Sequence, residues 1–330
     1  MFRHLTKNAI FLIAAIAVST GAIAQKTSKT APPWPTRPLR ILVGFPGGSS
    51  PDLVARLLQE PLSKALGQPV IVENRPGAAG NIAANLVAKA TDDYTIGVMI
   101  NGNMTIAKLL NPATPYDPEK DLAPISLIGT APLVLTVPVS APGHNAQEFF
   151  VAARNAGNKW SYGSPGVGTV GHIGMELLKT KTGIDPVHVP YPGNPQVIAA
   201  MIGGQINLAL LPPGLATTQI RAGKLRAIGV TSAGRSPLAP EVPSLAEAGI
   251  RGYQLEIWTA AAAPASMPKP IVARLSALIS EIVRTPEMRQ KLFVQGWQVA
   301  GTSPEGLANR IKSDTALLGG VIAMRGIRVD

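Results

Sequence analysis

The chain has 330 residues, with 30 Lys and Arg against 19 Asp and Glu, a formal net charge of +11 and no cysteine. Without cysteine it can form no disulfide, no cysteine-ligated metal site, no thiol nucleophile and no lipid-modified N-terminal cysteine. The basic residues stand singly rather than in runs, with few aromatic residues between them, which argues against nucleic-acid binding. We expect a basic, solvent-facing surface that attracts small anions weakly.

Residues 1–24 have the pattern of a secretory signal peptide. Arg3 and Lys7 begin it, an apolar segment follows, and Ala22 and Ala24 form an A-x-A cleavage site. An uncleaved membrane anchor is the alternative, but the apolar run is shorter than the roughly 20 residues that a spanning helix needs. Cleavage removes two basic and no acidic residues, leaving a charge of 11 − 2 = +9 and about 300 residues, enough for two domains.

Residues 25–38 are a proline-rich linker, after which strand and helix patterns alternate. The first set comprises strands at residues 39–45, 69–74 and 94–100 and helices at 50–66 and 81–90. The second set comprises strands at 159–164, 187–191, 206–211 and 224–232 and helices at 170–183 and 195–204. This alternation predicts an α/β protein with parallel sheets covered by helices.

The last third of the chain has three helical patterns, at residues 269–284, 286–296 and 304–323, which we expect to pack on the first sheet. Two long extended segments, 123–139 and 252–264, connect the α/β units. We interpret them as crossings that leave lobe I near Leu133 and return to it near Ile257. The expected domains are therefore lobe I, residues 39–133 plus 257–330, and lobe II, residues 134–256, joined by a hinge that allows closure around a ligand.

The first of two glycine-rich loops follows the first strand and reads GFPGGSSPD. Gly47 and Gly48 allow a tight turn with exposed N–H groups. Ser50 is the expected N-cap of the next helix, Pro51 suits its first position, and Asp52 suits its first turn. A helix N-terminus carries partial positive charge and free N–H donors, so this loop is a candidate anion site.

The second loop contains Gly166-Val-Gly168-Thr-Val-Gly171, which matches the G-x-G-x-x-G dinucleotide fingerprint by spacing. That fingerprint needs an acidic residue at the end of the next strand, but Asp185 precedes that strand and Tyr191 ends it. We therefore interpret the loop as a second helix N-terminus, capped by Thr169. If the loops face each other they can hold two ends of one small acid, and otherwise they are ordinary strand-to-helix turns.

The sequence has no catalytic signature. It has no G-x-S-x-G elbow and no H-E-x-x-H pair. The spacing of the histidines and acids indicates no catalytic pair among His144, His172, His188, Glu73, Asp117, Asp121 and Glu176. His188 alternates with two valines and is expected to be structural. We expect no catalytic residue, no cofactor and no metal.

The motifs VIVENRPGAAGN, residues 70–81, and G-x-G-T-x-x-H, residues 166–172, resemble those of the Bug-type (TctC-like) receptors of tripartite tricarboxylate transporters. The resemblance covers nearly all of the chain after the signal. It implies a fold similar to type II periplasmic binding proteins, with two lobes and two crossing strands. The positions that match the family's ligand-binding residues are Phe45, Gly47, Gly48, Ser49, Ser50, Asp52, Asn101, Gly102, Asn103, Ser164, Gly166, Val167, Gly168, Thr169, His172 and Tyr191.

The chain departs from the family pattern in both loops. The usual Ala-Gly-Gly of the first loop reads Gly47-Gly48-Ser49, with Pro51 before the acid. Polar residues of the second loop are replaced by Val167, Val170 and Gly171. Leu211 and Pro212 stand where many relatives carry an Asp-Asn pair, so an obvious partner for an ammonium group is missing. We expect a mono- or dicarboxylate with an apolar or aromatic body rather than an amino acid.

The resemblance implies a periplasmic receptor that delivers a small carboxylate to membrane transporter subunits without changing it. We expect a monomer that binds no nucleic acid. Two alternatives stay open: an exported enzyme, such as a hydrolase, on the same architecture, and a ligand sensor for a signalling partner.

Overall fold

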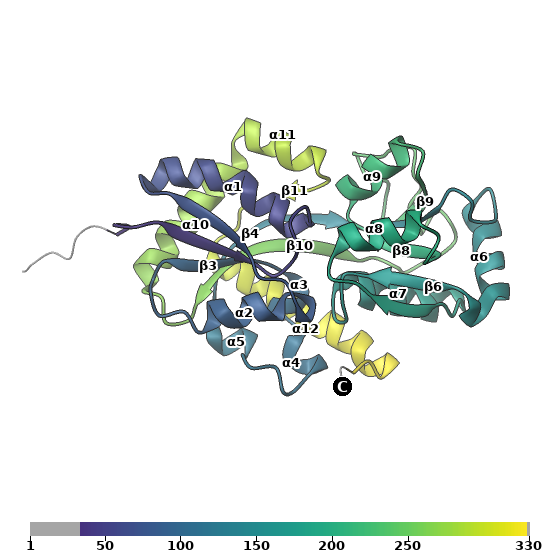
Figure 1. Cartoon of the computed structure of the whole chain (residues 1–330), viewed down its shortest axis with the longest axis horizontal. Coiled ribbons are helices and arrows are strands. Elements are labelled where there is room, and N and C mark those ends of the chain that lie inside the picture. The colour runs from purple at the N-terminus through teal and green to yellow at the C-terminus, as the bar shows by residue number, and fades with distance from the viewer. Residues whose placement is uncertain (1–33, 329–330) are drawn as a thin grey trace, which may run out of the picture. The chain divides into compact units, whose positions relative to one another are not determined.

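The computed structural model describes residues 34–328 and contains two β-sheets (Figure 1). The predicted signal peptide and the predicted linker up to residue 33 lie outside the described residues. Among residues 34–328, no helix combines the length and the apolar composition that crossing a membrane requires.

The first sheet has six strands in the order β11-β4-β10-β3-β1-β2. They are β1 (Leu39–Val43), β2 (Val70–Asn74), β3 (Thr95–Ile100), β4 (Leu122–Pro132), β10 (Glu256–Pro264) and β11 (Gln298–Val299). β1 pairs in parallel with β2 and β3, whereas β10 runs antiparallel to both β3 and β4. The predicted parallel pairing is found among β1, β2 and β3, whereas β10 and β11 run antiparallel to their neighbours, so the first sheet is mixed.

Helices cover both faces of the first sheet (Figure 1). Along β10, Ala261 and Ala263 face one core and Ala260 and Ala262 the other, because successive side chains of a strand point to opposite faces. The first core includes α1 (Ser50–Leu66), α10 (Lys269–Arg284) and α11 (Pro286–Val294), and the second includes α2 (Asn81–Ala88) and the start of α12 (Pro304–Arg325). Three short helices, α3 (Asn101–Met104), α4 (Ala107–Leu110) and α5 (Pro118–Asp121), follow β3.

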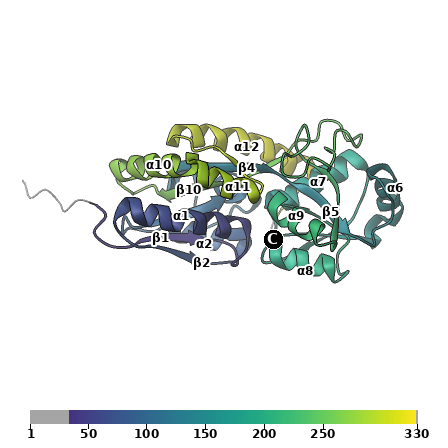
Figure 2. The same cartoon turned by 90° about the horizontal axis from the view of Figure 1, so that it is seen from above.

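The second sheet has five strands in the order β7-β6-β8-β5-β9. They are β5 (Val134–Pro138), β6 (Ser161–Ser164), β7 (Val187–Pro190), β8 (Leu208–Leu211) and β9 (Leu225–Val230). β6 is parallel to β7 and β8, and β5 is antiparallel to β8 and β9. One face packs against α6 (Ala146–Ala156) and α7 (Val170–Thr182), and the other against α8 (Asn194–Ile202) and α9 (Pro213–Arg221). Figure 2 shows α7 and α8 on opposite sides of β5.

The chain passes between the two sheets at Leu133, since β4 ends at Pro132 and β5 begins at Val134. It returns through β10, which begins at Glu256. The prediction that all three C-terminal helices pack on the first sheet is wrong for the second half of α12. There, buried apolar residues such as Leu318 join the core of the second sheet.

The two helices that follow the glycine loops have the predicted extents but not all the predicted caps. α1 runs through Pro61 to Leu66, and its N-cap is Ser49. The prediction of Ser50 as N-cap is wrong by one residue, because Ser50 already belongs to the first helical turn. α7 begins after the predicted N-cap Thr169 and ends at the predicted Gly183.

Candidate functional site

The first loop is closed by a hydrogen bond between a glycine amide and an acid in the helix that follows. Gly48 has a φ of +79°, a left-handed conformation that favours glycine. Its N–H donates to Asp52 Oδ2 at 2.9 Å. Ser49 then has φ −72° and ψ 155°, the extended conformation of an N-cap, but its side chain makes no capping bond.

The second loop repeats this arrangement with different residues. Gly168 has a φ of +85°, and its N–H donates to His172 Nδ1 at 3.2 Å. Thr169, the N-cap, has φ −73° and ψ 156°, and its hydroxyl donates to the Gly166 carbonyl instead of capping α7. The two loops therefore share one backbone design, in which a left-handed glycine is tied to the side chain four residues later.

This design leaves amides free at the start of both helices. In α7, the His172 and Ile173 N–H groups both donate to the Thr169 carbonyl, so the Val170 and Gly171 N–H groups precede the first intrahelical bond. In α1, the Ser50 N–H stands in the equivalent place. These donors lie at the positive ends of the helix dipoles.

Both helix N-termini border one pocket between the two sheets, which we call the central pocket. It has about 480 Å³ of space not filled by atoms, which includes open solvent, and the part that a water-sized molecule can occupy is about 40 Å³. The lining residues are Phe45, Ser49, Ser50, Pro51, Ile100, Asn101, Leu133, Pro165, Thr169, Val170, Gly171, Asn194, Leu210, Pro212, Ile257 and Trp297. The lining within the described residues is mostly apolar and includes neither Lys nor Arg.

Two glycines, Gly102 and Gly193, lie where loops of the two sheets approach each other closely. A Cβ atom on Gly102 would lie 2.6 Å from the carbonyl oxygen of Gly168. A Cβ atom on Gly193 would lie 2.9 Å from the hydroxyl of Ser49. At Gly102 the obstacle is backbone, so this close approach requires glycine, whereas at Gly193 the side chains of Ser49 and Pro46 would have to shift.

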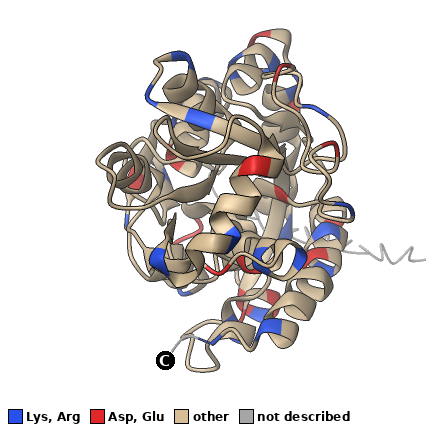
Figure 3. Ribbon diagram, turned by 90° about the vertical axis from the view of Figure 1, so that its right-hand side faces the viewer, with Lys and Arg blue, Asp and Glu red and all other residues tan. Residues whose placement is uncertain are grey.

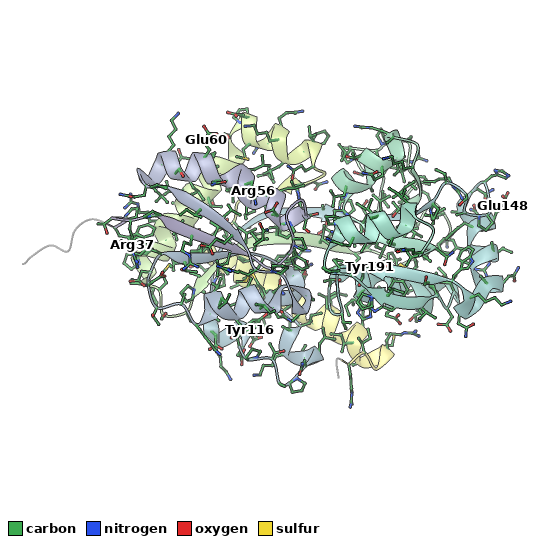
Figure 4. All side chains as sticks on the ribbon, viewed as in Figure 1. Arg37, Arg56, Glu60, Tyr116, Glu148 and Tyr191 are labelled. Carbon is green, nitrogen blue, oxygen red and sulfur yellow. The ribbon has the colours of Figure 1, made fainter. Side chains whose placement is uncertain are left out.

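A second, larger space, the rim pocket, lies beside the second loop. It has about 1230 Å³ of space not filled by atoms. It is lined by the segment 77–79, by Gly166 and Val167, and by Tyr191, which is labelled in Figure 4. Ala78 and Ala79 have φ values of 49° and 53°, which strain the backbone at this contact. We choose the central pocket as the candidate site despite its smaller volume, because the free helix amides meet there.

The predicted site residues fall into three groups. Those that line the central pocket are Phe45, Ser49, Ser50, Asn101 and Thr169. Those that line the rim pocket are Gly166, Val167 and Tyr191. The third group lines neither pocket and lies within the two loops or next to them: Gly47, Gly48, Asp52, Gly102, Asn103, Ser164, Gly168 and His172.

Asp52 belongs to the supporting group. Its side chain is almost fully buried, accepts a bond from Asn74 at 2.9 Å, and forms an ion pair with Arg56 at 3.0 Å. Arg56 is labelled on α1 in Figure 4. Burial alone would raise the pKa of Asp52, but the hydrogen bonds from Arg56, Asn74 and Gly48 outweigh it and lower the pKa. Asp52 therefore stays charged and holds the first loop closed.

The two asparagines after β3 also make internal bonds. The Asn101 amide donates to the Glu256 carbonyl at 3.1 Å, which ties α3 to the start of β10. Asn103 donates to the Ala79 carbonyl at 2.9 Å and to Asn81 Oδ1 at 2.8 Å. Asn103 thereby fixes the strained segment at Ala78 and Ala79. Asn101, by contrast, also lines the central pocket.

A buried aromatic cluster lies under the second loop. The rings of His172 and His188 stack with centroids 4.2 Å apart, and Tyr162 stacks on His188 at 4.8 Å. Burial lowers the pKa of His172 to about 4 and, helped by repulsion from His172, the pKa of His188 to about 3. Both imidazoles are therefore neutral at pH 7. The sequence gives no sign of this pairing, because the two histidines are 16 residues apart in different elements.

Ser164 Oγ lies 2.7 Å from His188 Nε2, the spacing of a hydrolase dyad. Ser164 is fully buried, however, and lines neither pocket, so a substrate in either space would not reach it. Among the described residues, no three His, Asp or Glu side chains are grouped to hold a metal. Basic and acidic residues are interspersed along the ribbon in Figure 3, in keeping with the scattered charges of the sequence.

Sequence reasoning missed several residues of the central pocket. Asn194 begins α8, Ile257 lies in β10, and Trp297 follows α11. Nothing in the sequence except their hydrophobicity indicates that Ile257 and Trp297 line the pocket. Asn194 could have been suspected, because Gly193-Asn-Pro195 is a third turn from a strand into a helix.

Comparison with known proteins supports the architecture. Residues 54–327 match the family model described as tripartite tricarboxylate transporter family receptor. The chain is 35% identical over 300 residues, 89% of each chain, to the UPF0065 protein in the tcbD–tcbE intergenic region of Pseudomonas sp. strain P51.

Two solved structures show the same fold with ligands. The Rpa4515 protein of R. palustris with adipate is 31% identical, with a TM-score of 0.87, over 89% of this chain and 99% of that one. MatC from Rhodopseudomonas palustris with bound malate is 31% identical, with a TM-score of 0.83, over 88% of this chain and 100% of that one.

These matches confirm the predicted two-lobed periplasmic binding protein fold and the predicted family. They also favour a binding protein over the alternative of an enzyme. The chain belongs to the tripartite tricarboxylate transporter receptor family of periplasmic solute-binding proteins.

Proposed function

We propose that the chain captures a small carboxylate in the central pocket and delivers it to a tripartite tricarboxylate-type membrane transporter. The observation that carries this proposal is the meeting of two helix N-termini, from α1 and α7, at one pocket whose described lining has no Lys or Arg. The free amides of Ser50, Val170 and Gly171 are suited to a carboxylate, because N-terminal amides and the helix dipole attract anions without a cationic side chain.

The apolar lining sets the character of the rest of the ligand. Phe45, Leu210 and Trp297 offer apolar surface, while the nearby hydroxyls of Ser49 and Thr169 offer only short polar contacts. Burial of apolar ligand surface contributes about 25 cal/mol per Å². A mono- or dicarboxylate with an apolar body therefore suits the pocket better than a densely charged ligand. The adipate and malate bound by the two solved relatives are small dicarboxylates.

Release requires the two lobes to separate. We propose that lobe I comprises residues 39–133 and 257–330 and lobe II residues 134–256, and that the crossing strands act as the hinge. In support, the chain changes sheets at Leu133 and again before Glu256. Opening at these strands would expose both helix N-termini to solvent.

The test is a carboxylate panel that includes adipate, malate, phenylpropionate and benzoate, measured by thermal shift and calorimetry, with the neutral adipamide as matched control. A ligand at 100 times its Kd should stabilise the protein by about 2.7 kcal/mol. If every carboxylate leaves the melting temperature unchanged while adipamide or a neutral sugar raises it, the proposal is wrong.

The transport role needs a separate measurement. Cells that lack the chain should take up the ligand much more slowly, and restoring the chain should recover uptake only when the membrane subunits are present. Normal uptake without the chain would favour the alternative of a ligand sensor.

A further inference from the structure

We propose that Asn194 and Ser49 form a polar subsite across the two lobes that recognises a hydroxyl group, so that the preferred ligand is a hydroxycarboxylate. This inference rests on the proposed function, because it concerns a second group on the same bound carboxylate. It names Asn194 as a specificity residue and narrows the ligand class.

Asn194 has a buried side-chain amide oxygen that makes no internal hydrogen bond. Only 7% of its surface is exposed, it lines the central pocket, and its Oδ1 atom has no hydrogen-bond partner. Buried amide oxygens of side chains are nearly always bonded, since an unmade bond is costly. Asn194 is also the first residue of α8, so its side chain stands at a third helix N-terminus beside the pocket.

Ser49 has the same property on the opposite lobe. It is 1% exposed, and its Oγ atom is buried without a partner. As the N-cap of α1 it would ordinarily bond to an amide of its own helix, but it does not. The corresponding hydroxyl in the second loop, on Thr169, is bonded to the Gly166 carbonyl.

Gly193, the residue just before Asn194, lies against the first loop, because a Cβ atom there would lie 2.9 Å from Ser49 Oγ, 3.0 Å from Pro46 and 3.3 Å from Gln196 Oε1. Ser49 and Asn194 both line the central pocket, one from each lobe. A ligand group placed between them could bond to both at once.

The chemistry of these atoms indicates a hydroxyl. The Asn194 Oδ1 atom needs a donor, which a carboxylate lacks. A ligand hydroxyl can donate to Oδ1 and accept from the Ser49 hydroxyl. Meanwhile the carboxylate beside it can bind the free amides of Val170 and Gly171. A site built to bond a hydroxyl disfavours an analogue without one, because its buried polar groups then stay unpaired.

The experiment compares three pairs of acids that differ by one hydroxyl: malate with succinate, 2-hydroxyadipate with adipate, and phenyllactate with phenylpropionate. Calorimetry should show that the hydroxy acid of a pair that binds has a Kd at least tenfold lower than its partner. Asn194→Ala should reduce the ratio of the two Kd values to below about twofold, because it weakens the binding of the hydroxy acid only. Ser49→Ala is the second variant and should act in the same direction.

Asn85→Ala is the matched control. It removes a side-chain amide whose oxygen is also buried without a partner, but Asn85 lies in α2 and does not line the central pocket. It should leave the ratio unchanged. Melting temperatures of all three variants show whether each one folds.

The possible failures are distinguishable. If no carboxylate binds, the proposed function is wrong. If carboxylates bind but no hydroxy acid is preferred, the hydroxyl subsite is wrong and the proposed function stands. If Asn194→Ala lowers the affinity for both acids of a pair equally, the inference is also wrong. Asn194 would then bind the carboxylate or stabilise the closed state instead of recognising the hydroxyl.

Discussion

Replacement of Val170 by proline removes one amide N–H from the start of α7 with little change to the backbone. Val170 is the first helical residue, where proline is tolerated because its missing N–H has no intrahelical partner. The preceding Thr169 has a ψ of 156°, the extended conformation that proline requires of the residue before it. Gly168 would be unsuitable, since its φ is +85° and its N–H is bonded to His172.

The size of the effect follows from the bond that is lost. A hydrogen bond to a charged group contributes about 1.5–3 kcal/mol, so the Kd for a bound carboxylate should rise about 10- to 150-fold. Val170 is 2% exposed and packs in the core of the second lobe, so part of any loss comes from its side chain. Val170→Ala removes that packing and keeps the N–H, and it is the matched control.

Calorimetry with the tightest carboxylate of the panel, together with the melting temperature of each variant, separates the two contributions. Val170→Pro should bind at least tenfold more weakly than Val170→Ala at similar thermal stability. Equal affinity of the two variants would mean that this amide does not contact the carboxylate, and the role assigned to the α7 N-terminus would be wrong.

Three further predictions concern the loops and what supports them. Gly102→Ala should weaken carboxylate binding at least tenfold in calorimetry, because its Cβ would lie 2.6 Å from the Gly168 carbonyl oxygen, whereas Gly320→Ala, with nothing within 4 Å, should not. The free energy of unfolding should fall as the pH falls from about 6.5 towards 4: His172 and His188, with pKa values of about 4 and 3, stay neutral in the folded state while the unfolded chain takes up protons. Denaturant unfolding at pH 7 and pH 5 checks this, and an equal value at both would contradict it. Asp52→Asn should lower the free energy of unfolding by about 1–3 kcal/mol, because the buried carboxylate accepts bonds from Gly48, Asn74 and Arg56, and it should not weaken carboxylate binding; a large loss of affinity would show that the carboxylate charge is needed for binding.

The sequence was sufficient for features that depend on local pattern. The extents of α1 and α7 follow from apolar residues at helical spacing and from the stop at Gly183. The likeness of the two loops is also visible, since each is a strand, a glycine turn and a helix. The error at the α1 cap arose because Ser49 and Ser50 are both good N-caps, and only the backbone geometry distinguishes them.

The remaining features depend on contacts between distant segments. The stacking of His172 on His188 joins α7 to β7, and no periodicity within either segment reports it. The antiparallel entry of β10 between β3 and β4 joins segments more than 120 residues apart. The sequence places Asn194 at a turn from a strand into a helix, but only the structure shows that its side-chain oxygen is buried without a partner.

The two loops have the same backbone design, but the side chain that accepts the glycine hydrogen bond is charged in one and neutral in the other. In each, the amide of a left-handed glycine bonds to the side chain four residues on, and the first residues of the helix line the pocket. In α1 the acceptor is Asp52, whose charge offsets part of the positive helix end. In α7 the acceptor is His172, which is neutral at pH 7 and offsets nothing. The α7 end is therefore the stronger anion site, and we expect a carboxylate to bind the second lobe first, with the hydroxyls and Phe45 of the first lobe closing over it.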